Sequence, residues 1–251
     1  GNRPDVSSPP MPRKSRAERT QQASAFRRRL LHWYRRHGRD LPWRRTRDPY
    51  HIVVSEFMLQ QTQVSRVEGY YHRFLERYPS IEALAAAPAA AVRESWEGLG
   101  YYRRAANLHR LAQAVVGEHA GVVPSDVRQL AKLPGVGRYT AGAVACFAFE
   151  RVAATVDTNV ARVIRRVFHP RLRGAAAGRR VWETAEQILP RSGKRAWEVN
   201  QGLMELGALV CTARVARCGE CPVRPACLTG TRVGGAKAGR TPVTQDAPLS
   251  R

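Results

Sequence analysis

Apolar residues recur at helical spacing through most of this chain, and that periodicity limits its fold more than any other feature. The stripes follow the i, i+3, i+4, i+7 pattern of helices with one buried face, and they lie within residues 67–78, 108–116, 160–168 and 181–189. Pro79 and Pro190 end two of them. Strand-like alternation is nearly absent, because the short apolar run 51–54 leads directly into a helical pattern. We therefore predict an all-α fold.

The two ends of the chain lack this periodicity. Residues 1–20 are rich in Pro, Ser and Arg, and residues 230–251 in Gly, Ala, Thr and Pro. Such compositions bury too little apolar surface to fold, so we expect a disordered basic arm and a disordered tail. No apolar stretch of about 18 residues predicts a membrane span, and no signal-peptide hydrophobic region is visible. We expect a cytoplasmic protein, nucleoid-associated if bacterial, with no membrane partner.

The net charge of the chain is strongly positive. Lys and Arg number 42 against 20 Asp and Glu, which gives a formal net charge of +22. An excess of this size is usually a footprint for polyanions, and nucleic acid is the leading partner. The alternative is a solvated basic surface, or a codon bias that favours Arg and Ala. Much of the excess lies between Arg13 and Arg47, so part of it belongs to the basic arm.

A glycine-containing turn between two helical patterns points to the same partner. Leu133, Pro134, Gly135, Val136 and Gly137 form a tight turn in which the glycines permit positive φ and close backbone approach. A second helix is expected from the next residue, which makes the unit a helix–hairpin–helix. Free backbone N–H groups at a helix N-terminus are a ready anion site, suited to a DNA phosphate. An ordinary interhelical turn is the alternative.

Four cysteines gather near the end of the folded part. Cys211, Cys218, Cys221 and Cys227 have the spacing C-x6-C-x2-C-x5-C. Four thiolates so close in sequence would wrap one metal centre, and zinc and a [4Fe–4S] cluster both accept four Cys. The spacing alone does not separate the two, and unpaired cytosolic thiols are the remaining alternative. Cys146 sits apart in an apolar run and is interpreted as a core thiol.

Six short motifs occur in order over residues 26–229. They are Leu41–Arg44, Ser55–Val64, Gly98–Tyr102, Leu133–Ala141, Val156–Val160 and Asn200–Cys211. With these motifs in this order, followed by the four-cysteine spacing, the chain resembles the iron–sulfur branch of the helix–hairpin–helix DNA glycosylases. Within that branch it resembles the MutY-like adenine DNA glycosylases. The resemblance implies that the cysteines hold [4Fe–4S] rather than zinc.

The resemblance also implies two helical lobes. Residues 46–152 would form a helical barrel that contains the hairpin, and residues 21–45 together with 153–229 would form the iron–sulfur cluster domain. Double-stranded DNA with a mispair or lesion would lie in the cleft between the lobes, bound by a monomer. The target base would be flipped out of the stack before its glycosidic bond is broken.

Glu56 is the candidate acid. It is flanked by apolar residues, and burial among them would raise its pKa and leave it protonated and able to donate. From local sequence alone it would be a surface residue that caps a helix with Ser55. The resemblance assigns Glu56 the protonation of the adenine ring.

Asp157 is the candidate second carboxylate. It precedes the amphipathic run from Val160, so the free N–H groups and dipole of that helix would hold it ionised. An ionised carboxylate there would stabilise a sugar cation or activate water. A plain N-cap is the alternative from local sequence. The resemblance makes Asp157 catalytic, with Asn159 orienting it or the water.

Position 139 sets the expected reaction type. In bifunctional relatives that resemble endonuclease III, a lysine follows the hairpin and forms a Schiff base. Here the residue is Tyr139, and a phenol cannot form that imine. We expect a monofunctional glycosylase with no efficient AP lyase activity, in which Tyr139 lines the pocket near the sugar.

Further residues match the DNA contacts of the family. Gln61 and Tyr101 stand at positions inserted into the duplex beside the orphaned base. Trp43, Arg44 and Gln201 match the pocket for the flipped adenine. Core packing would equally explain the two aromatic residues, and an exposed helix position would explain Gln61.

The resemblance predicts hydrolysis of the N-glycosidic bond of adenine opposite 8-oxoguanine or G. Only 24 residues follow Cys227, without a core pattern, so the C-terminal domain that reads 8-oxoguanine in longer relatives is not expected. Thymine or uracil removal opposite G is the first alternative, because compact thymine glycosylases also lack that domain. A non-catalytic DNA-binding iron–sulfur module is the second.

Overall fold

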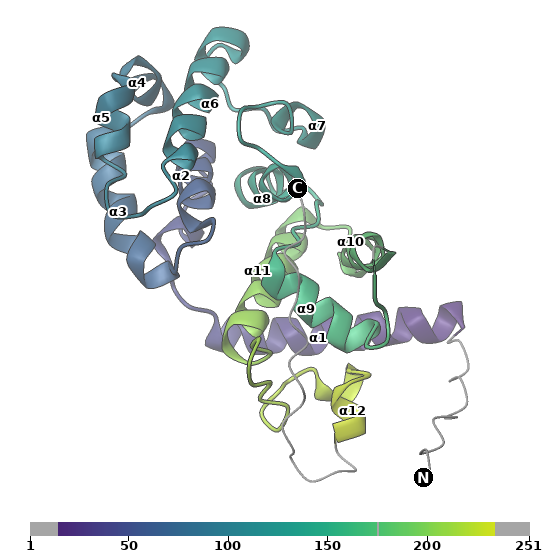
Figure 1. Cartoon of the computed structure of the whole chain (residues 1–251). Coiled ribbons are helices and arrows are strands. Elements are labelled where there is room, and N and C mark those ends of the chain that lie inside the picture. Colours follow the sequence, from purple (N-terminus) through teal and green to yellow (C-terminus); the bar gives the residue numbers. More distant parts are fainter. Residues whose placement is uncertain (1–14, 175, 234–251) are drawn as a thin grey trace, which may run out of the picture.

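The computed structural model describes residues 15–174 and 176–233 and confirms the all-α fold (Figure 1). No β-strand occurs in this described part, where pairing is limited to an isolated bridge between Cys211 and Ala216. No helix within the same ranges has the length and apolar character needed to cross a bilayer. The elements are α1 (Arg16–His37), η1 (Pro42–Arg44), α2 (Pro49–Leu59), α3 (Val64–Arg77), α4 (Ile81–Ala86), α5 (Ala89–Glu94), α6 (Arg103–His119), α7 (Val127–Leu130), α8 (Arg138–Phe149), α9 (Thr158–Phe168), α10 (Ala176–Ile188), α11 (Gly193–Leu209), η2 (Arg224–Ala226) and α12 (Gly230–Val233).

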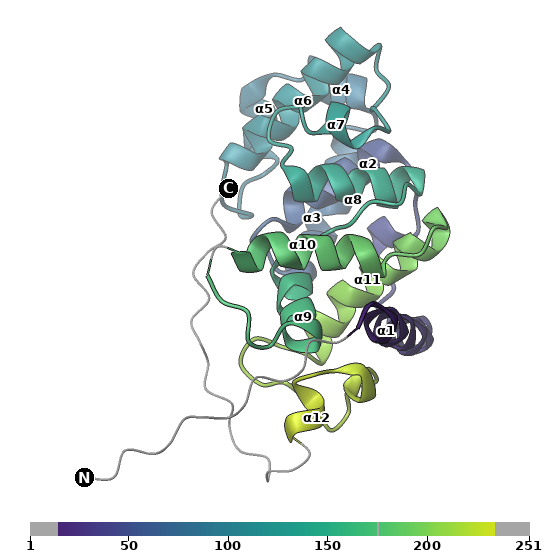
Figure 2. The ribbon, with the colours of Figure 1, turned by 90° about the vertical axis from the view of Figure 1, so that its right-hand side faces the viewer.

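The helices pack around two hydrophobic cores. The first is formed mainly by α2, α3, α6 and α8, and α2 is buried at Tyr50 and from Ile52 to Met58 because helices pack around it. The second is formed by α1, α9, α10 and α11. Leu189 and Met204 pack against both cores and join them. Figure 1 shows α2–α6 at one end of the molecule and α1 with α12 at the other, and Figure 2 shows α1 end-on beside α11.

The structure differs from the sequence analysis at three boundaries. The first helix begins at Arg16, so residues 16–20 are helical rather than part of a disordered arm, and residues 230–233 are helical as well. The cause at the N-terminal end is a capping box, in which Ser15 and Glu18 satisfy each other's backbone N–H groups. The remainder of the expected arm and tail lies outside the described residues. Leu41 and Trp43 join the first core, earlier than the expected boundary at 46.

An extended buried segment carries the chain from the first core to the second. It follows the left-handed Glu150 and includes Ala154 and Val156. The buried Asn200 of α11 holds it by donating to the Ala153 carbonyl at 2.9 Å and accepting from the Thr155 N–H at 3.3 Å. Gly142 of α8 permits the close approach, because a Cβ there would lie 2.4 Å from the Ala154 carbonyl oxygen. The segment ends at Asp157, which therefore lies beside α8.

Candidate active site

Glu56 lies near the C-terminal end of α2 and is 5% exposed. Burial raises its pKa to about 7, and the negative charge of Asp157 acts in the same direction. Hydrogen bonding from Tyr139 and the charge of Arg44 oppose this rise. Its Oε2 atom is buried and has no hydrogen-bond partner among the described residues. Near neutral pH, a substantial fraction of Glu56 is therefore protonated and can act as an acid.

Asp157 is the N-cap of α9. Its Oδ1 accepts the Val160 N–H at 2.7 Å, and its Oδ2 accepts from the Asn159 side-chain amide at 3.1 Å. These contacts and the positive charge of Arg162 lower the pKa of Asp157, as the sequence analysis expected. Burial outweighs them, so the pKa lies above its ordinary value. The helix terminus alone does not set the charge of this carboxyl.

The hydroxyl of Tyr139 is affected by the charges of both carboxyls. Tyr139 is the second residue of α8. Burial is the largest cause of the raised pKa of its hydroxyl, and the charges of Glu56 and Asp157 raise it further. The charge of Asp157 also raises the pKa of Glu56. The structure thus brings together two carboxyls and a phenol from α2, α8 and the start of α9, which are far apart in sequence.

A buried ion pair lies beside Glu56. Arg44 donates from Nε to Gln201 at 2.7 Å and from Nη2 to Glu205 at 2.6 Å. Glu205 is fully buried on α11 and also pairs with Arg39. Since a buried carboxylate must be compensated, the two arginines hold Glu205, and Glu205 in turn fixes Arg44. The charge of Arg44 reaches Glu56 and lowers its pKa.

Trp43 takes a packing position. It is 6% exposed in the first core, and its ring meets Tyr71 edge to face with the ring centroids 5.5 Å apart. This packing agrees with the alternative left open by the sequence, and a role for Trp43 in the base pocket stays a prediction. Arg44 and Gln201 are hydrogen-bonded to each other, which joins two of the three residues expected in a base pocket.

The hairpin turn between α7 and α8 exposes glycines and buries its apolar side chains. Leu133 is 5% exposed and Val136 8% exposed, so both anchor the turn in the first core. The exposed Gly135 has φ 75°, and a Cβ there would meet Asn107 at 2.6 Å. Gly137 is the N-cap residue of α8 and makes no side-chain capping hydrogen bond. The Val136 N–H donates to the Leu133 carbonyl within the turn. Asp126 caps α7.

Gln61 and Tyr101 lie on two exposed loops. Gln61 follows α2 with φ 58°, and Tyr101 precedes α6 with φ 50° and a 61% exposed side chain. A left-handed conformation is costly for residues with a Cβ and recurs at functional sites. Tyr101 is therefore not the core aromatic that the alternative interpretation suggested.

The four cysteines of the C-terminal loop are free thiols gathered in one region. Cys227 is buried and the other three are half-buried. Burial, followed by the charges of the other three thiols, raises the pKa of Cys221 to about 11, which places the four sulfurs within electrostatic reach. Yet no three His, Cys, Asp or Glu residues of the described ranges are placed to hold a single metal ion.

A chain of hydrogen bonds runs from Asp157 to this cysteine loop. Asn159 donates to Asp157 and accepts from Arg162 at 2.7 Å, and Arg162 donates to the Cys211 carbonyl at 2.8 Å. Arg166 also reaches Cys211, with its guanidinium 3.4 Å from the sulfur. The capped end of α9 and the cysteine loop are thus linked by side-chain hydrogen bonds.

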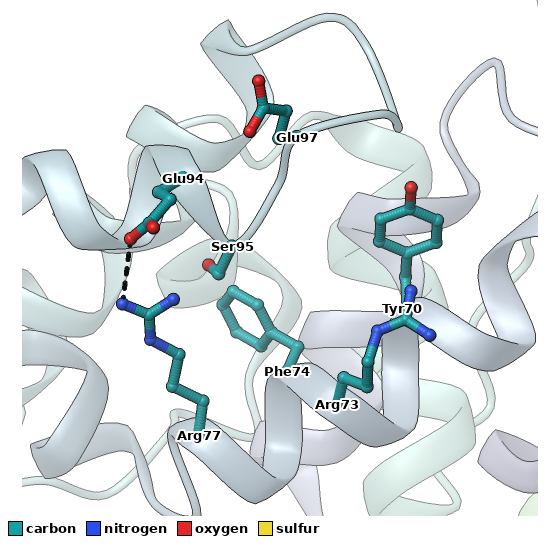
Figure 3. A pocket seen from close by; sticks show the side chains of 7 residues that line it. All are labelled: Tyr70, Arg73, Phe74, Arg77, Glu94, Ser95 and Glu97. Atoms are coloured by element: carbon teal, nitrogen blue, oxygen red, sulfur yellow. Dashed lines mark hydrogen bonds and ion pairs between the residues drawn. The ribbon is translucent and has the colours of Figure 1, made fainter.

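A surface hollow of about 370 Å³ lies elsewhere, between α3 and the segment at the end of α5 (Figure 3). Its lining mixes both charges, and Arg77 pairs with Glu94 across 3.1 Å. Arg73 lies over the Tyr70 ring at 4.7 Å. No residue predicted for the site lines this hollow, so the chemistry of the two carboxyls is separate from it.

Four residues that support the site are not marked as such in the sequence: Glu205, Asn200, Arg162 and Arg104. Each carries a buried or half-buried polar group with partners in other elements. A signal was present for Glu205, which interrupts an otherwise apolar stretch of α11. The other three lie inside or beside motifs without differing in type from exposed neighbours.

The fold and the site together define a class of protein: a two-core helical protein that holds two carboxyls near an exposed hairpin turn. A family model described as "HhH-GPD superfamily base excision DNA repair protein" matches residues 54–189. The chain therefore belongs to the HhH-GPD superfamily.

Known relatives agree with this placement. An adenine DNA glycosylase of Mycolicibacterium smegmatis is 49% identical over 77% of this chain and 66% of its own length. The Rattus norvegicus adenine DNA glycosylase is 43% identical over 89% of this chain and 45% of its own length. The chain thus spans about half to two thirds of these relatives. The solved structure of a thermostable thymine-DNA glycosylase superposes with a TM-score of 0.78 at 33% identity, covering 84% of this chain and 98% of that one.

Proposed function

We propose that this protein is a monofunctional DNA glycosylase that hydrolyses the N-glycosidic bond of adenine mispaired with 8-oxoguanine or guanine. One observation carries the proposal: Asp157 raises the pKa of Glu56, and both carboxyls, which come from different elements, act on Tyr139. Two carboxyls in unlike environments suit the cleavage of a glycosidic bond through an oxocarbenium-like state. The adenine glycosylase relatives support the choice of base.

Glu56 would supply the proton to the leaving adenine. A neutral adenine ring leaves more readily once a ring nitrogen is protonated, and the acid works best with a pKa near the working pH. Glu56 has that pKa because of burial, and its Oε2, which has no hydrogen-bond partner among the described residues, would donate to the base.

Asp157 would stabilise the positive charge that develops on the sugar and orient the attacking water. The Asn159 amide holds its Oδ2 from one side, which fixes the direction of the carboxyl. Tyr139 would line the sugar side of the pocket through its hydroxyl. Its lack of an amine excludes the imine chemistry of a lyase at this position.

DNA would be held at the hairpin and at two loops. The backbone around Gly135 and Gly137 would bind phosphate, while Leu133 and Val136 anchor the turn. Gln61 and Tyr101 would fill the gap left by the flipped base. Arg44, held by Glu205 and hydrogen-bonded to Gln201, would contact the adenine together with Gln201 and Trp43.

We further propose that Cys211, Cys218, Cys221 and Cys227 hold a [4Fe–4S] cluster. The donor set fits such a group, because the four thiols are free and act on one another electrostatically, and a set of four Cys accepts a [4Fe–4S] cluster. A bound cluster would tie the loop from 211 to 227 to the end of α11 and would accept or release one electron.

The cluster proposal predicts about four iron atoms and four inorganic sulfides per chain after anaerobic purification, since four Cys suit one [4Fe–4S] group. Iron, zinc and sulfide analysis of the purified protein checks this. The buried Cys146 lies outside the set of four, so its replacement by Ser should leave the iron content unchanged. One zinc per chain without sulfide would contradict the proposal.

A single-turnover panel of duplexes tests the substrate. Duplexes that contain A opposite 8-oxoguanine, A opposite G, T opposite G or U opposite G are incubated with excess protein and then cleaved with alkali. We expect strand cutting at the two adenine mispairs. Thymine removal is the second candidate, favoured by the structural match to a thymine-DNA glycosylase, and preferential cutting of the T duplex would establish it instead. Tight binding without any cutting would indicate a non-catalytic DNA-binding module.

The same duplexes test the absence of lyase activity. Incubation with borohydride should yield no protein–DNA adduct beyond background, and strands should stay intact until alkali is added, because Tyr139 cannot form an imine. A Tyr139→Lys variant is the comparison, since it introduces an amine at this position. An adduct formed by the unaltered protein in high yield would contradict monofunctional chemistry.

A further inference from the structure

Arg104 is a buried arginine that joins two loops of the first core. It is the second residue of α6 and is 6% exposed. Its two terminal nitrogens reach six acceptors on two segments of chain. These acceptors are the carbonyls of Phe57 (3.1 Å), Met58 (2.7 Å), Gln60, Leu99 (3.3 Å) and Gly100 (3.1 Å) and the hydroxyl of Thr62 (3.0 Å).

The environment explains why a guanidinium stands there. Three of the carbonyls belong to the C-terminal end of α2, where helix carbonyls lack partners and the helix dipole is negative. A planar group with several fixed N–H donors satisfies such a set better than an ammonium does. Burial lowers the pKa of Arg104, and its Nε has no partner in the described part of the chain. Its charge is therefore compensated mainly by these acceptors.

The two segments that Arg104 joins are the segments that carry Gln61 and Tyr101. Gln61 lies between the acceptors Gln60 and Thr62, and Tyr101 directly follows the acceptor Gly100. Both residues are left-handed and exposed, a conformation that surrounding contacts must maintain. The Arg104 guanidinium also lies 5.4 Å from the Tyr101 ring centroid.

We propose that Arg104 is a positioning residue that holds Gln61 and Tyr101 together as one preformed wedge for duplex DNA. The inference rests on the proposed function, in which these two side chains fill the gap beside a flipped base. One rigid side chain fixes both loops before DNA arrives, so less ordering remains to be done on binding.

Hydrogen exchange in the free protein tests the holding of the loops without any use of activity. In Arg104→Lys and Arg104→Gln, amide exchange in residues 60–63 and 99–102 should accelerate at least about 10-fold, because charge-assisted hydrogen bonds are lost. Exchange in the core of α8 should change far less. The exposed Arg103→Lys is the matched control, with no acceleration expected. Loop acceleration no greater than that of α8 would show general destabilisation and overturn the proposal.

A duplex with 2-aminopurine opposite 8-oxoguanine tests the coupling to DNA, since its fluorescence rises when the base leaves the stack. Arg104→Lys should lower this rise and slow single-turnover excision from the adenine duplex about 10²-fold, as misplaced groups do, while binding to matched duplex is retained. In the Tyr101→Ala background the same change should have a much smaller effect. Independent, multiplicative effects would overturn the proposal. If the unaltered protein cuts no duplex, the proposed function fails, whereas the exchange result still decides whether Arg104 holds the loops.

Discussion

Replacing Asp157 by Asn should abolish most excision while binding to mispaired duplex is kept. A carboxylate that stabilises charge or activates water contributes about 10²–10⁴-fold to a rate, and the Asn amide has no charge to offer. The fold should survive, because Asn is as good an N-cap as Asp and its oxygen would still accept the Val160 N–H. Single-turnover excision and duplex-binding titrations with the Asp157→Asn protein measure the two effects separately.

Asp48→Asn is the matched control for this variant. Asp48 also caps a helix, accepting the His51 N–H at 3.0 Å, but it is exposed at the opposite end of α2 from Glu56. The same chemical change there should leave excision intact. Undiminished excision by Asp157→Asn would refute the catalytic role of this residue. A joint loss of excision and duplex binding would indicate that Asp157 supports the fold instead.

The helical fold was predictable because its signal is local. Stripes of apolar residues at helical spacing need only neighbours along one helix, and they mark α3, α6, α9 and α10 correctly. The start of α1 was also encoded locally, in the Ser15 and Glu18 capping box, but the basic composition of that region concealed it. The inclusion of Leu41 and Trp43 in the first core depends on packing against distant helices, which no local pattern contains.

The site was predictable only in part, for the same physical reason. Local sequence alone favoured a surface position for Glu56, whereas the structure buries it among the apolar neighbours along α2. These neighbours gave no sign that Arg44 acts on its pKa, because Arg44 is fixed by Glu205, 161 residues away. The cap of Asp157 was visible in the sequence, whereas its burial, which reverses the direction of the pKa shift, was not.

Replacing Glu56 by Gln should remove excision and stabilise the protein at the same time. The lost proton donor costs about 10²–10⁴-fold in rate, as for other general acids. The stability gain follows from linkage: the pKa of Glu56 is about 7 in the folded protein and 4.5 in the unfolded chain. Below pH 4.5 both states are protonated and nothing is lost. Between pH 4.5 and 7 the unfolded chain releases its proton first, so stability falls as pH rises and then levels off above pH 7.

The size of this effect makes it measurable. The difference between the two pKa values of Glu56 corresponds to about 3 kcal/mol at pH 8. Denaturant unfolding should therefore show Glu56→Gln to be more stable than the unaltered protein at pH 8, with the gap closing toward pH 4.5. The exposed Glu118→Gln should show no such gap. A gap that is constant with pH would mean that folding does not shift the pKa of the Glu56 carboxyl.

The same pKa predicts the pH profile of excision by the unaltered protein. If protonated Glu56 is the active form, the single-turnover rate constant should fall above pH 7, approaching tenfold per pH unit. Tyr139→Phe provides the internal check, because the Tyr139 hydroxyl lowers the pKa of Glu56 and its removal should move the fall to higher pH. A rate that is flat or rising through pH 7 would assign the proton to another group. A fall that moves as expected ties the burial of one carboxyl in α2 directly to the breaking of the glycosidic bond.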